Sequence, residues 1–451
     1  MSESEQHRPT RRLERLADAL ETGTMMRARV MLNALHPAEI AHLLESLPQE
    51  KRELTWEMIN TDVEGDVLTY VNDEVRDSLI RDMANDELIA ATEGLDVDDL
   101  ADILQVLPDT VIQTVLQSMD EQRRGRLEAV LSFPEDTAGG LMNTDAITVR
   151  PDNTLDVVLR YLRRLGEIPE MTDNLIVVNR DNQYTGLLSI TDLLTKEPSL
   201  TVFDVMNTEE EGILGDTPDN EVASLFEQRD LISAPVVDEN GVLLGRITID
   251  DVVDVIRDEA DHSFMSMAGL NEETDMFAPV IASTRRRTPW LATNLITALI
   301  ASWVIAQFEA SIEKLVALAI LMPIVASMGG IAGSQTLTLV IRGMALGQIS
   351  YANSWRLLTK ELAVGALNGM LWALILAVIT YFWFGDYRLG MIIAAAIVIN
   401  LIVAALAGAT VPLIIRKFGA DPALGGGVVL TTITDVIGFM AFLGLATIFL
   451  L

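Results

Sequence analysis

The spacing of apolar residues divides the first part of the chain from the rest. Across residues 20–135, apolar side chains recur at helical spacing, as in AEIAHLLESLP at 38–48. A similar segment, DDLADILQVLP, follows at 98–108. Repeated short amphipathic motifs predict helices stacked into a small superhelix, because each repeat buries its apolar face against the next.

A second pattern follows, in which an α/β unit occurs twice. Each copy begins with Met-Asn, at Met142 and Met206, and continues with an amphipathic helix and two β-rich runs around a polar turn. LIVVNRDNQYTGLLSITDLL at 175–194 aligns with APVVDENGVLLGRITIDDVV at 234–253. Both copies end in Gly-x-x-[Ser/Thr]-x-x-Asp, which predicts a helix capped by the hydroxyl residue. The two hydroxyl–acid pairs are Ser189 with Asp192 and Thr248 with Asp251.

The last part of the chain is apolar. Five stretches are long enough to cross a bilayer, for which about 20 residues suffice. They cover 289–308, 315–346, 362–384, 389–415 and 424–451. The second is longer than one span requires and rich in glycine, which predicts a break or a strong tilt. Arginine and lysine gather in alternate loops, so the positive-inside rule places residues 1–287 in the cytoplasm and the C-terminus outside.

Charge separates the same two halves. Residues 285–451 hold 10 basic and 6 acidic side chains, so residues 1–284 hold 22 basic and 59 acidic ones, a net charge of −37. That charge disfavours nucleic-acid binding. The chain has no cysteine, which excludes disulfides, thiolate zinc sites and iron–sulfur clusters. No Walker A or His-Glu-x-x-His segment is present, so no enzyme is predicted, and the charged first 20 residues predict no targeting signal.

Asp435 lies deepest of the acidic residues in the apolar stretches. A carboxylate at that depth costs several kcal/mol unless it faces water, a cation or a partner. Small and hydroxylated residues surround it, including Gly427 and Thr431, which favours a functional role. The alternatives are a structural ion pair with Arg342 or a proton relay. Asp421 begins the same stretch, where an N-cap explains it.

This order of parts resembles the MgtE family of magnesium channels and transporters. The resemblance extends to MGGIAGSQTLTLVIR in the second apolar stretch and to DPAL and TITDVIG in the fifth. It implies a multi-domain membrane protein with an all-α superhelical N-domain, tandem α/β cystathionine-β-synthase (CBS) domains, a connecting helix and a five-helix transmembrane domain. The expected ranges are 1–135, 136–200, 201–256, 257–284 and 285–451.

The resemblance also implies a mechanism. Members are homodimers embedded in the lipid of the plasma (inner) membrane, with one Mg²⁺ pore between the subunits. The pore carboxylate of the family falls on Asp435, and a second, cytoplasmic-side carboxylate on Asp421. Cytosolic Mg²⁺ would close the pore by binding at Asp98, Asp102, Asp230, Asp251, Asp254 and Glu259. A further expected ligand is ATP or another adenine nucleotide, for which the candidate residues are Ser189, Asp192, Thr248 and Asp251.

Four positions depart from the family pattern. Ile331 stands where an amide is expected, Gly427 where a polar residue is common, and Pro218 and Asn220 where sensor carboxylates are expected. Two other interpretations stay open: a CBS-regulated transporter of another divalent cation such as Co²⁺ or Mn²⁺, and a membrane-anchored Mg²⁺ or nucleotide sensor that transports nothing. A pure anchor has no use for a buried carboxylate such as Asp435.

Overall fold

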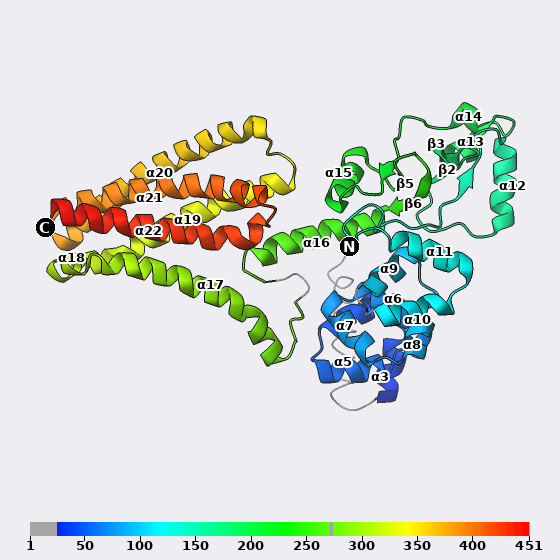
Figure 1. The fold of residues 1–451 in the computed structure, drawn as a ribbon, viewed down its shortest axis with the longest axis horizontal. Helices are drawn as coiled ribbons and strands as arrows, with labels where there is room; N and C mark the ends of the chain where they lie inside the picture. The colour runs from blue at the N-terminus through cyan, green and yellow to red at the C-terminus, as the bar shows by residue number, and fades with distance from the viewer. Residues whose placement is uncertain (1–24, 106, 108, 271–273, 451) are drawn as a thin grey trace, which may run out of the picture. The chain divides into compact units, whose positions relative to one another are not determined.

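The structure is a computed structural model that describes residues 25–105, 107, 109–270 and 274–450 (Figure 1). It consists of two compact units. Unit 1 runs to Asp261 and includes the segment that ends at Pro279. Unit 2 comprises the remainder, which begins at His262 and resumes at Val280.

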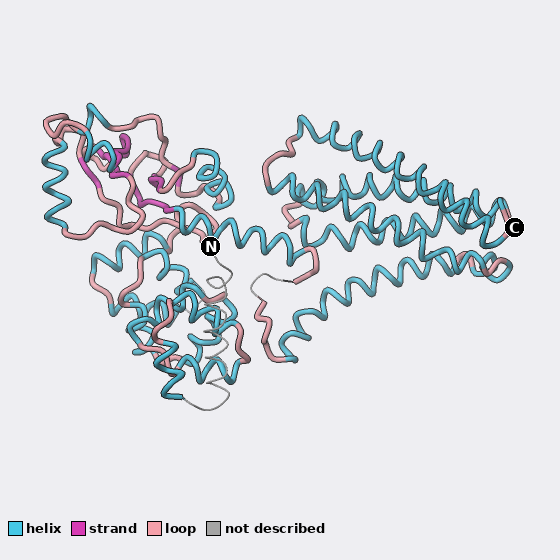
Figure 2. The backbone as a smooth tube through the Cα atoms, turned by 180° about the vertical axis from the view of Figure 1, so that it is seen from behind, coloured by secondary structure: helices cyan, strands magenta, loops and turns pink. Residues whose placement is uncertain are grey.

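The first part of unit 1 is all-helical, as the apolar spacing predicts. Short helices follow one another with tight turns between them (Figure 2). They are α3 Met25–Leu32, α4 Pro37–Glu45, α5 Gln49–Trp56, α6 Thr61–Tyr70, α7 Asp73–Asp82, α8 Asn85–Thr92, α9 Val97–Gln105, α10 Asp109–Ser118 and α11 Glu121–Val130.

A recurring arginine, which the sequence reading missed, organises these helices in pairs. Arg52 of α5, Arg76 of α7 and Arg124 of α11 each donate from Nε to the carbonyl eight residues earlier and from Nη2 to the carbonyl five residues earlier. The distances are 2.7 to 3.3 Å. These carbonyls lie at the end of the preceding helix, where the regular i+4 backbone donor is missing. Each arginine therefore ties the second helix of a pair to the end of the first.

The third pair, α8 and α9, has no such arginine, because Leu100 of α9 stands at that position. Arg123 of α11 instead donates to Thr92 O, Glu93 O and Leu95 O at 3.3, 2.5 and 2.7 Å. The pairing also shows that α9 is the counterpart of α5, so the similar segments at 38–48 and 98–108 occupy different places in the repeat.

We expect Arg123→Met to destabilise the helical domain by about 1–3 kcal/mol, because carbonyls at the end of α8 lose their donor. Thermal unfolding and hydrogen exchange of α8 in the full chain measure this. Arg126→Met, at an exposed position of the same helix, is the matched control and should change stability by less than about 0.5 kcal/mol. Equal effects of the two variants would contradict the capping role.

Two three-stranded sheets form the second part of unit 1, with identical topology. In each, the first strand is parallel to the second and the second antiparallel to the third. The first copy contains β1 Thr148–Val149, α12 Leu155–Leu165, β2 Asn174–Val178, β3 Tyr184–Ser189, α13 Ile190–Thr195 and α14 Val202–Val205. The second contains β4 Ile213–Leu214, α15 Asp219–Arg229, β5 Ser233–Val237, β6 Leu243–Thr248 and α16 Ile249–Ser266. Figure 2 shows these strands in magenta.

The last of these helices continues from the second α/β copy into the expected connecting helix. The expected boundary after residue 256 falls inside α16, which runs unbroken to Ser266 and contains neither proline nor glycine. The helical domain and the second α/β copy also share one continuous hydrophobic core, whereas a separate core lies within the first copy.

Five described helices of unit 2 are long and apolar enough to cross a membrane. They are α17 Val280–Ala306, α19 Ala317–Ala345, α20 Tyr351–Phe384, α21 Tyr387–Lys417 and α22 Pro422–Phe449, and the short α18 Glu309–Lys314 precedes α19. α21 packs against α19, α20 and α22. This bundle carries the candidate pore residues.

The break expected in the second apolar stretch is absent from this described segment, because α19 is one continuous helix through Pro323 and its glycines. A Cβ at Gly329 would lie 2.2 Å from Asn400 of α21, and one at Gly333 would lie 2.8 Å from Leu430 of α22. The glycines therefore permit close helix packing rather than a break.

Candidate functional site

Residues of α19 and α22 line an open groove in unit 2. Its volume is about 890 Å³. The polar side chains on its wall are the hydroxyls of Ser327, Ser334, Thr338 and Thr431, the amide of Gln335 and the carboxylate of Asp435. Each of these groups presents an oxygen, the ligand atom that hard divalent cations prefer.

Asp435 is half-buried in this wall, one helical turn after Thr431. The Thr431 hydroxyl donates to Gly427 O at 2.8 Å, which leaves its oxygen lone pairs available to a bound ion or water. The lining does not include Arg342, the ion-pair partner that the sequence offered as an alternative. The groove therefore combines one carboxylate with neutral oxygens.

A buried amide holds the two walls together. Asn400 of α21 is fully buried, and its Nδ2 donates to Val325 O of α19 at 2.8 Å. Its side chain fits against Gly329 of α19 and Gly438 of α22, where an added Cβ would lie within 2.2 and 2.7 Å of Nδ2. The sequence reading missed Asn400, although a single amide inside an apolar stretch is a signal that could have identified it.

Glu361 of α20 is a second acidic side chain enclosed by unit 2. It is buried and accepts from Thr336 of α19 at 3.2 Å and from Lys360 at 2.9 Å. The third predicted apolar stretch begins at residue 362, just after Glu361, whereas α20 already begins at Tyr351. Glu361 therefore braces α19 against α20.

Asp421 has the N-cap geometry that the sequence predicts. Its carboxylate accepts from Ala423 N at 2.8 Å and Leu424 N at 3.1 Å, at the start of α22. His262 at the end of α16 adds a contact, with Nε2 3.3 Å from Asp421 Oδ2. Just beyond, the sulfur of Met267 accepts from the groove residue Thr338 at 3.8 Å. Within unit 2, the last turns of α16 thus contact the start of α22, and the residue just after α16 contacts the groove.

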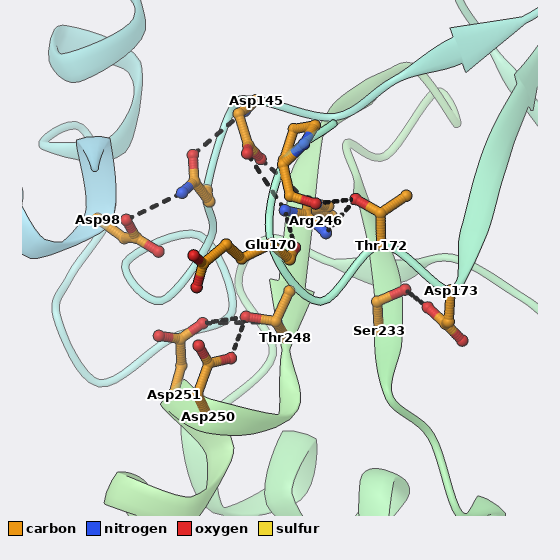
Figure 3. A network of polar contacts seen from close by, with 12 residues as sticks. Asp98, Asp145, Glu170, Thr172, Asp173, Ser233, Arg246, Thr248, Asp250 and Asp251 are labelled. Atoms are coloured by element: carbon orange, nitrogen blue, oxygen red, sulfur yellow. Dashed lines mark hydrogen bonds and ion pairs between the residues drawn. The ribbon is translucent and has the colours of Figure 1, made fainter. Parts of the chain in front are cut away.

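A cluster of carboxylates lies in unit 1. Asp98, Asp99 and Asp102 come from α9, and Asp250 and Asp251 from the first turn of α16. Figure 3 shows Asp98, Asp250 and Asp251 with the polar groups around them. We call these five residues the acidic cluster.

Hydrogen bonds fix the surroundings of the acidic cluster. Asn143 donates from Nδ2 to Asp98 Oδ1 at 3.1 Å and pairs through its backbone with Arg246 of β6. The Arg246 guanidinium in turn binds both carboxylate oxygens of Asp145, at 2.9 and 3.2 Å (Figure 3). Asp98 is thereby tied to the second α/β copy.

Burial and repulsion by neighbouring carboxylates raise the pKa of four members of the cluster, Asp98, Asp99, Asp102 and Asp251. Burial raises the pKa of Asp98 to about 8, with the charge of Asp251 adding to the effect. Burial likewise raises the pKa of Asp102 to about 7 and that of Asp99 to about 6. The pKa of Asp251 rises to about 7 through burial and the neighbouring Asp250. Because negative charge is destabilised at this site, binding of a cation there is favourable.

The sign of these pKa shifts predicts a pH dependence. Because the folded cluster binds protons that the unfolded chain has already released, its contribution to stability falls as pH rises from about 4 towards about 8. Without divalent cations, we expect the melting temperature of the full chain to be lower at pH 8 than at pH 6. Added Mg²⁺ should raise it more at pH 8, because protons compete less. A Mg²⁺ effect equal at both pH values would contradict this.

The other predicted sensor residues lie outside the acidic cluster. Asp230 is exposed and has left-handed backbone geometry (φ 52°) at the C-cap of α15. Asp254 and Glu259 are exposed farther along α16. No group of three or more His, Asp or Glu side chains with metal-binding geometry was found within 25–105, 107, 109–270 and 274–450. Asp99 and Asp250, which the sequence reading did not name, each adjoin a named residue.

The four residues predicted for a nucleotide have other partners. Ser189 caps α13 by accepting from Thr191 N at 3.1 Å, as its motif predicts. Thr248 precedes α16, and its backbone N–H donates to Asp251 at 3.4 Å, as in a capping box, while its hydroxyl contacts the carboxylates of Asp250 and Asp251. Asp192 lies 3.8 Å from Lys196. A nearby cavity of about 290 Å³ is lined by neither Ser189, Asp192, Thr248 nor Asp251. It carries three glutamates, Glu210, Glu211 and Glu221, beside Arg229.

Three family profiles match the chain in succession. A profile described as "MgtE intracellular N domain" matches residues 35–136, and CBS domain profiles match 138–198 and 202–258. A profile described as "Divalent cation transporter" matches residues 322–445.

Curated relatives match over nearly the whole length. The magnesium transporter MgtE of Thermus thermophilus is 30% identical over 440 residues, covering 96% of this chain and 98% of its own. The magnesium transporter MgtE of Bacillus subtilis is 28% identical over 436 residues, 97% of each chain. A solved cytosolic domain of the Mg²⁺ channel MgtE in complex with ATP is 33% identical and has a TM-score of 0.49, covering 53% of this chain and 98% of its own.

Proposed function

The chain belongs to the MgtE family, and from this premise we propose that it conducts Mg²⁺ across the plasma membrane under the control of cytosolic Mg²⁺. It is a multi-pass membrane protein whose N-terminal domain is cytoplasmic. With five spans, the C-terminus then lies outside.

The observation that carries the proposal is the oxygen-lined groove at Asp435. Mg²⁺ is small and loses water reluctantly, so proteins hold it through a few carboxylates with several waters retained. The hydroxyls and amide of the groove suit such waters, and Asp435 supplies the negative charge. Because the groove is open on one side, a second copy across a two-fold axis would close it into a pore with two facing carboxylates.

Gating follows from the acidic cluster. At low Mg²⁺ the carboxylates of α9 and α16 repel one another, and the compact arrangement of the domains is disfavoured. Bound Mg²⁺ neutralises them, so the compact state gains population. α16 leads directly into the segment whose Met267 contacts Thr338 in the groove, which provides a route from sensor to pore.

Asp230, Asp254 and Glu259 remain part of the proposal as residues that come closer when Mg²⁺ is bound. The nucleotide prediction is supported less well, because its four residues have other partners and the cavity beside them carries three glutamates. Those glutamates would repel a polyphosphate, so no step of the mechanism is assigned to ATP.

Two features bear on the choice of ion. Ile331 lines the groove in place of an amide, which leaves fewer ligands for the waters of the ion. The wall offers oxygen but neither thiol nor imidazole, which suits Mg²⁺ and Mn²⁺ alike and lacks the softer ligands that select later transition metals. A non-transporting sensor is disfavoured because its groove would have no use for Asp435.

Uptake into liposomes tests the proposal. The purified chain is reconstituted, and the entry of Mg²⁺, Co²⁺ and Mn²⁺ is followed with ion-sensitive dyes against protein-free vesicles. Mg²⁺ uptake supports the proposal. Uptake restricted to Co²⁺ or Mn²⁺ would show that this ion, and not Mg²⁺, is the substrate. The absence of any uptake by folded protein would favour the non-transporting sensor.

A further inference from the structure

A buried ion pair anchors the segment that precedes the first span. Asp275 is 5% exposed, and its Oδ2 accepts from Nη2 of Arg52, itself 2% exposed, at 2.8 Å. The backbone N–H of Asp275 donates to Glu74 of α7 at 2.7 Å, and Phe277 N donates to Asp275 Oδ1 at 2.8 Å. We call residues 274–279 the strap. Two helices of the helical domain therefore hold it within unit 1.

The arginine repeat explains why Arg52 needs this partner. Arg76, its counterpart in the next pair, has a carboxylate in its own helix, Asp73, at 3.0 Å. The residue at the same place before Arg52 is the neutral Gln49, whose side chain bonds to Glu53 instead. A buried guanidinium is costly without a negative partner. The strap supplies the carboxylate that the first pair lacks.

The length of the strap makes this contact consequential. Four residues lie between Asp275 and Val280, where α17 begins, so the two are five residue steps apart. A fully extended chain spans at most about 3.6 Å per residue, so this link reaches no more than roughly 18 Å. The helical domain cannot move farther than that from the start of α17 unless the ion pair breaks or α17 follows.

We propose that the strap couples the helical domain mechanically to the first span through Arg52 and Asp275. A displacement of α5 and α7 then pulls on α17 directly, in parallel with the route through α16. The role of this link in gating rests on the proposed function, whereas the anchoring of the strap does not.

Hydrogen exchange tests the anchoring. In the full chain, the amides of Asp275 and Phe277 should be protected, and Asp275→Asn should make them exchange at least about tenfold faster, because the charge that holds the strap is lost. Asp275→Glu, which restores the charge, should recover part of the protection. Asp156→Asn removes an exposed pair with Arg160 (2.7 Å) and should leave the strap unchanged. Equal exchange in wild type and Asp275→Asn would overturn the anchoring.

Mg²⁺ flux tests the coupling. Asp275→Asn should still conduct at low Mg²⁺, but the cytoplasmic Mg²⁺ needed for half-inhibition should rise by roughly fivefold or more, as expected for loss of one coupling contact. Asp156→Asn should follow the wild type. An unchanged inhibition curve despite faster exchange would overturn the coupling. Wild-type flux indifferent to Mg²⁺ would overturn both the proposed sensor and the coupling, while the exchange result would still decide the anchoring.

Discussion

Asp435→Asn is expected to reduce Mg²⁺ flux to the level of protein-free liposomes. The substitution keeps the size of the side chain and removes the charge of the groove. In the proposed dimer, the substitution removes the carboxylate from both subunits. Because each hydrogen bond from a charged group to the hydrated ion is worth about 1.5–3 kcal/mol, flux should fall by roughly 100-fold or more.

Asp386→Asn is the matched control for this result. Asp386 caps α21 by accepting from Arg388 N at 2.8 Å, and asparagine caps helices equally well. Its flux should equal that of the wild type. If correctly folded Asp435→Asn conducts Mg²⁺ as well as the wild type, the pore does not lie at this groove.

The second large effect is expected from the acidic cluster. Asp98→Asn combined with Asp251→Asn imitates the neutral state that protons or Mg²⁺ produce, because both carboxylates have a pKa raised by burial, to about 8 and about 7. The compact state should then form without Mg²⁺. We expect flux at low Mg²⁺ to fall by roughly tenfold or more and to become insensitive to cytoplasmic Mg²⁺.

Protons should act in the same direction on the wild type. Lowering the cytoplasmic pH from 8 to 6 protonates Asp98, Asp102 and Asp251, so flux at low Mg²⁺ should fall. Asp156→Asn, which neutralises an exposed carboxylate outside the acidic cluster, provides the control for the double variant. A double variant that conducts freely and still closes with Mg²⁺ would show that the sensor lies elsewhere.

Local sequence patterns predicted the elements well, for a physical reason. Helical spacing of apolar residues reports which face is buried, and turn residues report where strands end. The superhelical domain, the duplicated α/β unit and the five apolar helices follow from such patterns, as do the caps at Ser189 and Asp421.

Contacts between distant residues could not be predicted in the same way. Arg123 caps a helix about 30 residues earlier, and Arg52 pairs with Asp275 across 223 residues; no local periodicity encodes either partner. From local sequence alone, the glycines of α19 predicted a break in the helix. In the structure they instead make room for Asn400 and Leu430. Thr248 stands before α16 as its motif predicts, and its backbone N–H donates to Asp251 at 3.4 Å, but the contact of its hydroxyl with Asp250 was not part of that pattern.

The most direct test of the account is Mg²⁺ influx through the wild-type chain in oriented liposomes, with external Mg²⁺ fixed and cytoplasmic-side Mg²⁺ raised stepwise. The account predicts rapid influx at low cytoplasmic Mg²⁺ and a steep fall as Mg²⁺ fills the acidic cluster, beyond the loss of driving force calculated from the Mg²⁺ concentrations on the two sides. Influx that declines only in proportion to the gradient would contradict the claim that cytosolic Mg²⁺ closes the pore.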